Sequence, residues 1–162
     1  MICDGSRRVA IGLVTIEDID DVFLWKNDPT SIQQSLNRES ITWADHSDWF
    51  QQILRSANVC FLMCRSDLLD CKIGVVRFDI DASIAVLSIN LDPQMRGLGF
   101  GYECLSNAID FLAKNFKSVD VVQAKVRVEN KISDRIFKKI GFVKVCVEHK
   151  IKTLELRLND KG

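Results

Sequence analysis

One glycine-rich stretch decides the fold predicted for this chain: Leu91-Asp92-Pro93-Gln94-Met95-Arg96-Gly97-Leu98-Gly99-Phe100-Gly101-Tyr102. Its three glycines separate an alternating apolar segment from the strongest helical pattern in the sequence. Glycine allows the backbone to approach a ligand closely and to adopt conformations that a Cβ makes costly. The first turn of a helix adds unpaired N–H groups and the positive end of the macrodipole. The stretch therefore predicts a phosphate or diphosphate site, with the Arg96 guanidinium as an added cation.

Two other glycine-rich phosphate loops do not match this stretch. A nucleoside-triphosphate loop ends in Gly-Lys-Ser/Thr, whereas Tyr102-Glu103 follows the last glycine here. A dinucleotide loop reads Gly-x-Gly-x-x-Gly, and counting from Gly97 or Gly99 places Tyr or Cys at its last position. A turn in which the glycines have only a structural role remains the alternative.

Periodicity on both sides of the loop predicts an α+β fold with a mixed sheet. The expected strands are 7–14, 58–66, 72–80, 84–91, 119–128 and a hairpin within 142–158. Four helices are expected. The first starts at the capping box of residues 15–18, and the second covers 42–56. The third runs from the glycines to Phe116, and the fourth covers 131–140. Three successive strands with short links imply antiparallel pairing, so we expect a mostly antiparallel sheet flanked by helices.

Length and composition limit the possible functions. The 162 residues predict one domain, 1–162, and 22 basic residues balance 22 acidic ones, which argues against nucleic-acid binding. The chain has no apolar run long enough for a membrane span and no secretory pattern at its start, so we expect a cytoplasmic protein. The six cysteines lack zinc-ligand spacing, and we expect no metal and reduced thiols, with Cys60 and Cys64 in the core.

Further motifs place the loop in a family. Arg96-x-x-Gly99-x-Gly101, the preceding Leu91-Asp92-Pro93, Asn130-x-x-Ser133 and the segment 138–142 (Lys-Lys-Ile-Gly-Phe) resemble the signatures of the GNAT superfamily of N-acetyltransferases. The resemblance covers nearly the whole chain. It implies a GNAT-like acyl-CoA N-acyltransferase fold with a splayed central sheet, and acetyl-CoA as the cosubstrate.

The resemblance also implies which residues contact CoA. These are Ile89, Leu91, Arg96, Gly97, Leu98, Gly99, Phe100, Gly101, Tyr102, Asn130 and Phe137. Backbone N–H groups of 96–102 would bind the diphosphate, and the strand edge ending at Leu91 would pair with pantetheine amides. The Leu91 N–H would face the thioester carbonyl. Asn130 would contact pantetheine or cap the following helix.

The catalytic assignments leave alternatives open. The family often has a Tyr that protonates the departing thiolate, and Phe137 occupies that position here. We therefore assign the role of general acid to Ser133. The alternative is that the thiolate leaves without a proton donor. Candidate bases are Asp79, Asp81 and Glu103. Asn90 could instead orient a water or the amine. His46 is a further catalytic candidate, with a packing or capping role as its alternative.

The acceptor pocket is expected between the first two strands. The predicted substrate residues are Trp25, Asn27, Asp28, His46 and Trp49. Their pattern resembles bacterial amino-sugar N-acetyltransferases and implies a nucleotide-linked aminodeoxysugar as a small-molecule acceptor. The alternatives are a ribosomal-protein type N-terminal acetyltransferase and an acyl-CoA-binding module without turnover. Either a monomer or a homodimer is expected.

Overall fold

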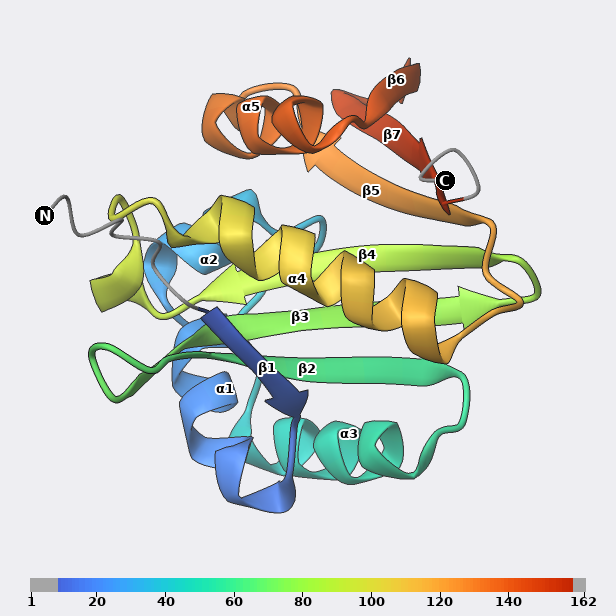
Figure 1. Cartoon of the computed structure of the whole chain (residues 1–162). Helices are drawn as coiled ribbons and strands as arrows, with labels where there is room; N and C mark the ends of the chain where they lie inside the picture. Colours follow the sequence, from blue (N-terminus) through green and yellow to red (C-terminus); the bar gives the residue numbers. More distant parts are fainter. Residues whose placement is uncertain (1–8, 159–162) are drawn as a thin grey trace, which may run out of the picture.

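A computed structural model describes residues 9–158, which form one seven-stranded sheet in the order β1-β2-β3-β4-β5-β7-β6 (Figure 1). The strands are β1 (Val9–Leu13), β2 (Val59–Ser66), β3 (Cys71–Asp81), β4 (Ile84–Leu91), β5 (Val121–Arg127), β6 (Val143–Glu148) and β7 (Ile151–Arg157). Strands β4 and β5 pair in parallel, and the other neighbours pair antiparallel. The predicted mixed, mostly antiparallel sheet is confirmed.

Five α-helices and two short 3-10 turns accompany the sheet in the described part of the chain. They are η1 (Ile16–Asp18), α1 (Ile19–Lys26), α2 (Pro29–Gln34), α3 (Trp43–Arg55), η2 (Pro93–Met95), α4 (Phe100–Asn115) and α5 (Lys131–Ile140). Helix α2 is a correction, because the sequence analysis expects no second helix before residue 42. Pro29 is tolerated at the first helical position, and the Asp28 carboxylate caps the helix by accepting from the Thr30 and Ser31 N–H groups.

The other helix ends follow the predicted capping residues. The Thr42 hydroxyl accepts a hydrogen bond from the Asp45 N–H and begins α3. The Asn130 side chain accepts from the Ser133 N–H at 3.2 Å and begins α5. Gly141, with φ of +120°, ends α5. Local capping chemistry therefore fixes the bounds of these helices.

Helices cover both faces of the sheet (Figure 1). Helices α4 and α5 cover one face, where residues such as Leu105, Ile109 and Phe137 share a core with Val76 and Leu154 of the sheet. Helices α1 and α3 cover the other face through a second core; its members are Val14, Val22, Trp25, Phe50, Phe61, Met63 and Val75. The two cores hold the central strands between two helical layers.

The cysteines for which the sequence predicts a core position are buried. Cys60, Cys64 and Cys104 are free thiols inside the core, and burial raises the pKa of Cys60 to about 11. Cys146 instead is exposed on β6. Because a thiol is most reactive as a thiolate, the raised pKa makes Cys60 an inert packing residue.

The sheet opens between β4 and β5. Residues Ile84–Leu87 of β4 pair with Val121–Ala124 of β5, and the register ends there. Beyond this point β4 continues to pair with β3, as far as Leu91 opposite Gly74. A Cβ on Gly74 would lie 2.6 Å from the Asn90 carbonyl oxygen, so glycine allows this close approach. The edge of β4 after Leu87 thus forms no strand pairs with β5, and we call the space between this edge and β5 the slot.

Candidate active site

The glycine-rich loop lies at the end of this slot. Gly97 and Gly99 have φ values of +73° and +85°, and Gly99 is the N-cap of α4. A side chain in this left-handed region costs about 1–2 kcal/mol. Gly101 serves close packing instead, because a Cβ there would lie 3.1 Å from Ile136 Cδ1 of α5. The loop presents the N–H groups of the first turn of α4 at the slot, which fits a bound diphosphate.

The edge of β4 supplies further backbone donors and acceptors. The Asp92 N–H donates to the Ile73 carbonyl of β3 at 2.8 Å. Because the N–H groups of alternate residues point to the same side of a strand, those of Ile89 and Leu91 point toward β5. Pairing with β5 ends at Leu87, so these groups open into the slot. An extended ligand with amide groups could pair with them as an added strand.

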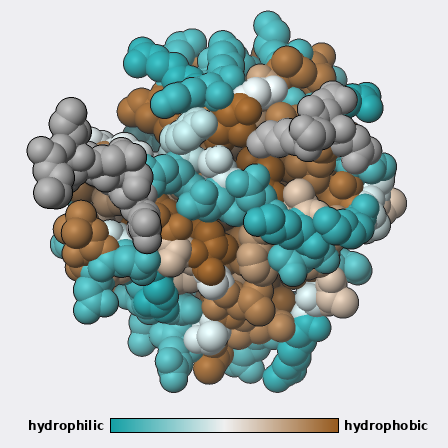
Figure 2. All heavy atoms as spheres, viewed as in Figure 1, coloured by the Kyte–Doolittle hydropathy of each residue, from teal (hydrophilic) through white to brown (hydrophobic). Residues whose placement is uncertain are grey.

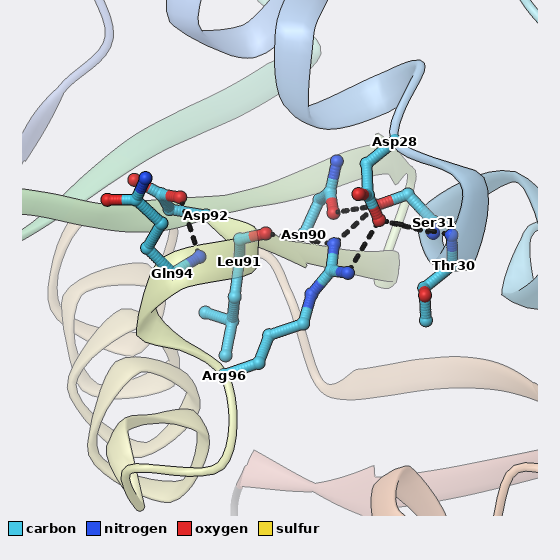
Figure 3. A network of polar contacts seen from close by, with 8 residues as sticks. All are labelled: Asp28, Thr30, Ser31, Asn90, Leu91, Asp92, Gln94 and Arg96. Atoms are coloured by element: carbon cyan, nitrogen blue, oxygen red, sulfur yellow. Dashed lines mark hydrogen bonds and ion pairs between the residues drawn. The ribbon is translucent and has the colours of Figure 1, made fainter.

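The Arg96 side chain is engaged by protein groups (Figure 3). Nη1 donates to Asp28 Oδ2 at 2.6 Å, and Nη2 donates to Ser31 Oγ at 2.6 Å and to the Leu91 carbonyl at 3.1 Å. The hydrogen bond from Arg96 holds the pKa of the Asp28 carboxyl below its usual value. We therefore revise the prediction that this guanidinium binds phosphate. It links α2 to the end of β4.

Asn90 and Asp28 belong to the same network. The Ser31 hydroxyl donates to Asn90 Oδ1 at 2.9 Å, so the oxygen of this carboxamide is held by α2 (Figure 3). The predicted substrate residue Asp28 is used for the Arg96 ion pair and the cap of α2. The sequence analysis does not single out Ser31, because nothing in its local pattern indicates a partner on β4.

The segment after α2 reaches the other side of the slot. Arg127, the last residue of β5, donates hydrogen bonds to the carbonyl oxygens of Ser35 and Leu36 at 2.7–3.0 Å. Arg38 forms an ion pair with Glu129, which follows β5. These contacts connect the chain that leaves α2 to the strand that diverges from β4.

Two predicted substrate residues have structural roles. Asn27 donates from Nδ2 to the Ile41 carbonyl at 2.9 Å and accepts from the Ile41 N–H at 2.8 Å, which closes the intervening loop. Trp25 is 5% exposed within the core beneath α1 and α3. Both predictions are revised, because Asn27 has its side chain occupied and Trp25 presents almost no surface to a substrate.

His46 is a buried packing residue, contrary to the predicted catalytic and substrate roles. Its ring has no exposed area, and Nε2 lies 2.9 Å from the Ile19 carbonyl oxygen. The Phe23, Trp49 and Phe50 rings surround it at centroid distances of 5.2–5.8 Å. Burial lowers the pKa of His46, which favours the neutral imidazole. His46 lies on the apolar face of α3, and this position accounts for its burial without a catalytic role.

Trp49 is half-buried and carries two cations. Lys26 Nζ lies 3.7 Å from the centroid of its ring, and Arg77 Cζ lies 5.3 Å from it. Arg77 is opposite Ser88, the first residue of β4 after the pairing with β5 ends. Burial and the Arg77 charge lower the pKa of Lys26 to about 8. We call these three residues the Lys26–Trp49–Arg77 cluster; the sequence analysis includes only Trp49.

Three predicted residues lie on α5 or at its N-terminal cap. Asn130 caps the helix, which is the alternative role given for it, and Ser133 is half-buried in the first turn. Phe137 is 3% exposed and lies edge-to-face with Phe142 at a centroid distance of 5.0 Å. We revise its predicted CoA contact to a core role, because only a small edge of the ring is accessible.

The candidate bases are separated from one another. Asp79 forms an ion pair with Arg77 at 3.1 Å. Asp81 pairs with Ile84 at the end of β3 farthest from the loop. Glu103 lies in the first turn of α4. Of the predicted polar catalytic residues, Asn90 is the one that the structure places on the part of β4 bordering the slot.

Two negative findings concern residues 9–158. No group of three or more His, Cys, Asp or Glu side chains in this range is arranged to hold a metal ion. Within the same residues, no helix combines the length and apolar character needed to cross a membrane.

Comparisons with known proteins agree with this architecture. A family described as "Acetyltransferase (GNAT) domain" matches residues 8–143. Spermidine N-acetyltransferase from Vibrio cholerae, solved with CoA and spermine, is 15% identical with a TM-score of 0.84; the match covers 93% of this chain and 96% of that chain. A domain from Methanocaldococcus jannaschii is 18% identical with a TM-score of 0.79, covering 93% and 99%. A dodecameric structure of the Vibrio enzyme is 16% identical with a TM-score of 0.77, covering 95% and 98%.

These comparisons establish the family and the fold. No curated protein sequence matches this chain. The named enzyme among the similar structures is a spermidine acetyltransferase, so the comparisons leave the predicted amino-sugar acceptor without direct support. The family match spans most of the sequence, and the structure has strands β4 and β5 that stop pairing after Leu87 and a loop with two left-handed glycines. The chain belongs to the GNAT acetyltransferase family, and it is an N-acetyltransferase that uses acetyl-CoA.

Proposed function

We propose that this enzyme acetylates the amino group of a nucleotide-linked aminodeoxysugar. The observation that carries the proposal is the Lys26–Trp49–Arg77 cluster, in which Arg77 lies opposite Ser88 of β4. The half-buried indole holds two cations close together, and their ammonium and guanidinium groups suit the phosphates of a nucleotide. The sequence pattern around Trp25 and Asn27 supports the same acceptor class by its resemblance to amino-sugar enzymes.

The pairing of three carboxylates with arginine side chains argues against a polyamine acceptor. A polyamine is a flexible polycation, and it requires carboxylates that are free to pair with its ammonium groups. Here Asp28 pairs with Arg96, Asp79 with Arg77, and Glu129 with Arg38. Within the Lys26–Trp49–Arg77 cluster, Arg77 is paired with Asp79, and Lys26 adds a positive charge that would repel such a substrate. A nucleotide-linked amino sugar carries negatively charged phosphates, which the Lys26 ammonium group would attract.

The proposed reaction is direct transfer. Acetyl-CoA supplies the acetyl group as a thioester, and a neutral amine attacks its carbonyl carbon to form the new C–N bond. The C–S bond breaks to release the thiolate, and the nitrogen loses one proton to water. The Leu91 N–H, at the end of β4, is the backbone donor that we assign to the developing oxyanion. Asn90 would orient the amine or a water through its amide nitrogen, because its oxygen is bound to Ser31. Ser133 remains our proposed proton donor to the thiolate.

A thiol-release assay with acetyl-CoA tests the acceptor class. The acceptors are a UDP-linked 4-amino sugar, spermidine, a peptide with a free N-terminus, and a blank. We expect turnover with the nucleotide sugar. Turnover confined to spermidine or to the peptide would overturn the proposal, and would identify a polyamine or a protein N-terminal acetyltransferase instead.

The same assay tests the Lys26–Trp49–Arg77 cluster. Replacing Lys26 and Arg77 together with Gln removes two contacts to the nucleotide phosphates. The KM for the nucleotide sugar should rise about tenfold, equivalent to about 1.4 kcal/mol, while the KM for acetyl-CoA stays unchanged. Lys144→Gln, on the exposed strand β6, is the matched control. An unchanged acceptor KM in the double variant would contradict the assignment of this cluster.

A further inference from the structure

Helix α5 presents a row of basic side chains that the proposed reaction does not use. Lys131, Arg135 and Lys139 are spaced four residues apart, and all three are exposed. Positions with this spacing lie along one side of a helix. Figure 2 shows a hydrophilic surface over α5, at the top of the view. We call the side of α5 that carries these three residues its basic side.

The charge is not balanced by neighbouring carboxylates. Lys138 lies 2.9 Å from Asp134 Oδ2, and Lys152 of β7 lies 3.2 Å from the same atom. On that side of the helix one carboxylate is therefore shared by two ammonium groups, which leaves one positive charge unbalanced. Between residues 9 and 158, by contrast, neither Lys139 nor Arg135 forms an ion pair. The two sides of α5 thus differ in net charge.

The basic side approaches the glycine-rich loop. Lys139 Nζ lies 4.3 Å from the centroid of the Tyr102 ring, and Tyr102 is in the first turn of α4. Ile136, one turn before Ile140 on α5, is the side chain that a Cβ on Gly101 would meet. Figure 1 shows α5 above the first turns of α4 in the same arrangement. The Lys139 ammonium group therefore contacts a side chain of the first turn of α4, the turn whose N–H groups fit the diphosphate.

We propose that Lys139, assisted by Arg135, binds the 3′-phosphate of CoA. In CoA the diphosphate is attached to the 5′ position of a ribose whose 3′ oxygen carries a further phosphate. With the diphosphate at the first turn of α4, the ribose joined to it would lie next to the loop, and the contact between Lys139 and Tyr102 brings α5 to the same turn. A dianionic phosphate suits a lysine and an arginine that lack protein counter-ions. This inference concerns the cosubstrate and does not depend on the acceptor.

Calorimetric titration with CoA and with 3′-dephospho-CoA tests the site without relying on turnover. The unmodified enzyme should bind CoA more tightly than dephospho-CoA. Lys139→Gln should weaken CoA binding about fivefold, the effect of one exposed ion pair, and leave dephospho-CoA affinity unchanged. Arg135→Gln should act in the same direction, and Lys144→Gln should leave both affinities unaltered.

Two outcomes would overturn the assignment. One is equal affinity of the unmodified enzyme for CoA and dephospho-CoA. The other is an equal loss for both ligands in Lys139→Gln, which would indicate a disturbed loop instead of a lost phosphate contact. Thermal unfolding of the variant checks its fold, because loss of the contact with Tyr102 at an exposed site should lower stability by a small amount only.

Discussion

Replacing Asp28 with Asn tests whether the Arg96 network holds α2 against the end of β4. Asn can still cap α2, because it accepts hydrogen bonds from N–H groups as Asp does, but it cannot form the ion pair. The Asp28 and Arg96 side chains are 19% and 27% exposed, and Oδ2 lies 2.6 Å from Nη1. For such a partly buried, charge-assisted contact we expect the free energy of unfolding to fall by about 1.5 kcal/mol. Asp28→Ala also removes the cap and should cost about 1 kcal/mol more.

The effect of Asp28→Asn should depend on pH. The hydrogen bond from Arg96 lowers the pKa of the Asp28 carboxyl below its ordinary value of 3.8. The stabilisation is therefore fully present above pH 3.8 and is lost as the pH falls through the lower pKa of the folded state. The difference in stability between the unmodified enzyme and Asp28→Asn should accordingly shrink in acid.

Urea unfolding across pH 3–7, followed by circular dichroism, measures this difference directly. Asp110→Asn, at an exposed position of α4, controls for the loss of one negative charge. If Asp28→Asn is as stable as the unmodified enzyme at pH 7, the ion pair has no stabilising role. A loss of stability that stays constant down to pH 3 would contradict the assigned pKa shift.

The remaining predictions concern the loop and the buried histidine. Gly99→Val should abolish CoA binding in calorimetry, because a branched side chain is incompatible with φ of +85° at the proposed diphosphate site. Gly12→Ala is the control and should bind CoA normally, since nothing lies within 4 Å of the added Cβ. Retained binding in Gly99→Val would refute this placement. His46→Phe should keep kcat, since the ring is buried among aromatic side chains. Because burial lowers the pKa of His46, the unmodified enzyme should lose stability as the pH falls below 6.5, and His46→Phe should lose less. A large fall in the kcat of His46→Phe would instead indicate a catalytic role for this histidine.

The sequence predicts the parts of the fold that depend on local chemistry. The Thr42 and Asn130 caps and the apolar spacing of α4 locate three helices, and the alternation in 84–91 locates β4. Each of these signals lies within a few residues of the element that it defines. Helix α2 is the exception, because a capping Asp followed by Pro has the same sequence as a turn.

The site is harder to predict because its contacts join distant segments. Arg96 and Asp28 are 68 residues apart, and Ser31 and Asn90 are 59 residues apart. A glycine-rich loop with an adjacent Arg predicts a free phosphate-binding guanidinium, and only the tertiary structure shows the competing carboxylate. Periodicity likewise places His46 on the apolar face of α3, but it does not show that the ring is fully buried.

The central claim is that the N–H groups of residues 96–102, together with the edge of β4 at Ile89 and Leu91, bind CoA. Titration of the 15N-labelled enzyme with CoA, followed by two-dimensional NMR, measures these amides one by one. The largest chemical-shift changes should occur at the loop and at Ile89 and Leu91, and changes at β1 and β2 should be small. Large changes confined to other strands or helices, with the loop amides unmoved, would contradict the claim.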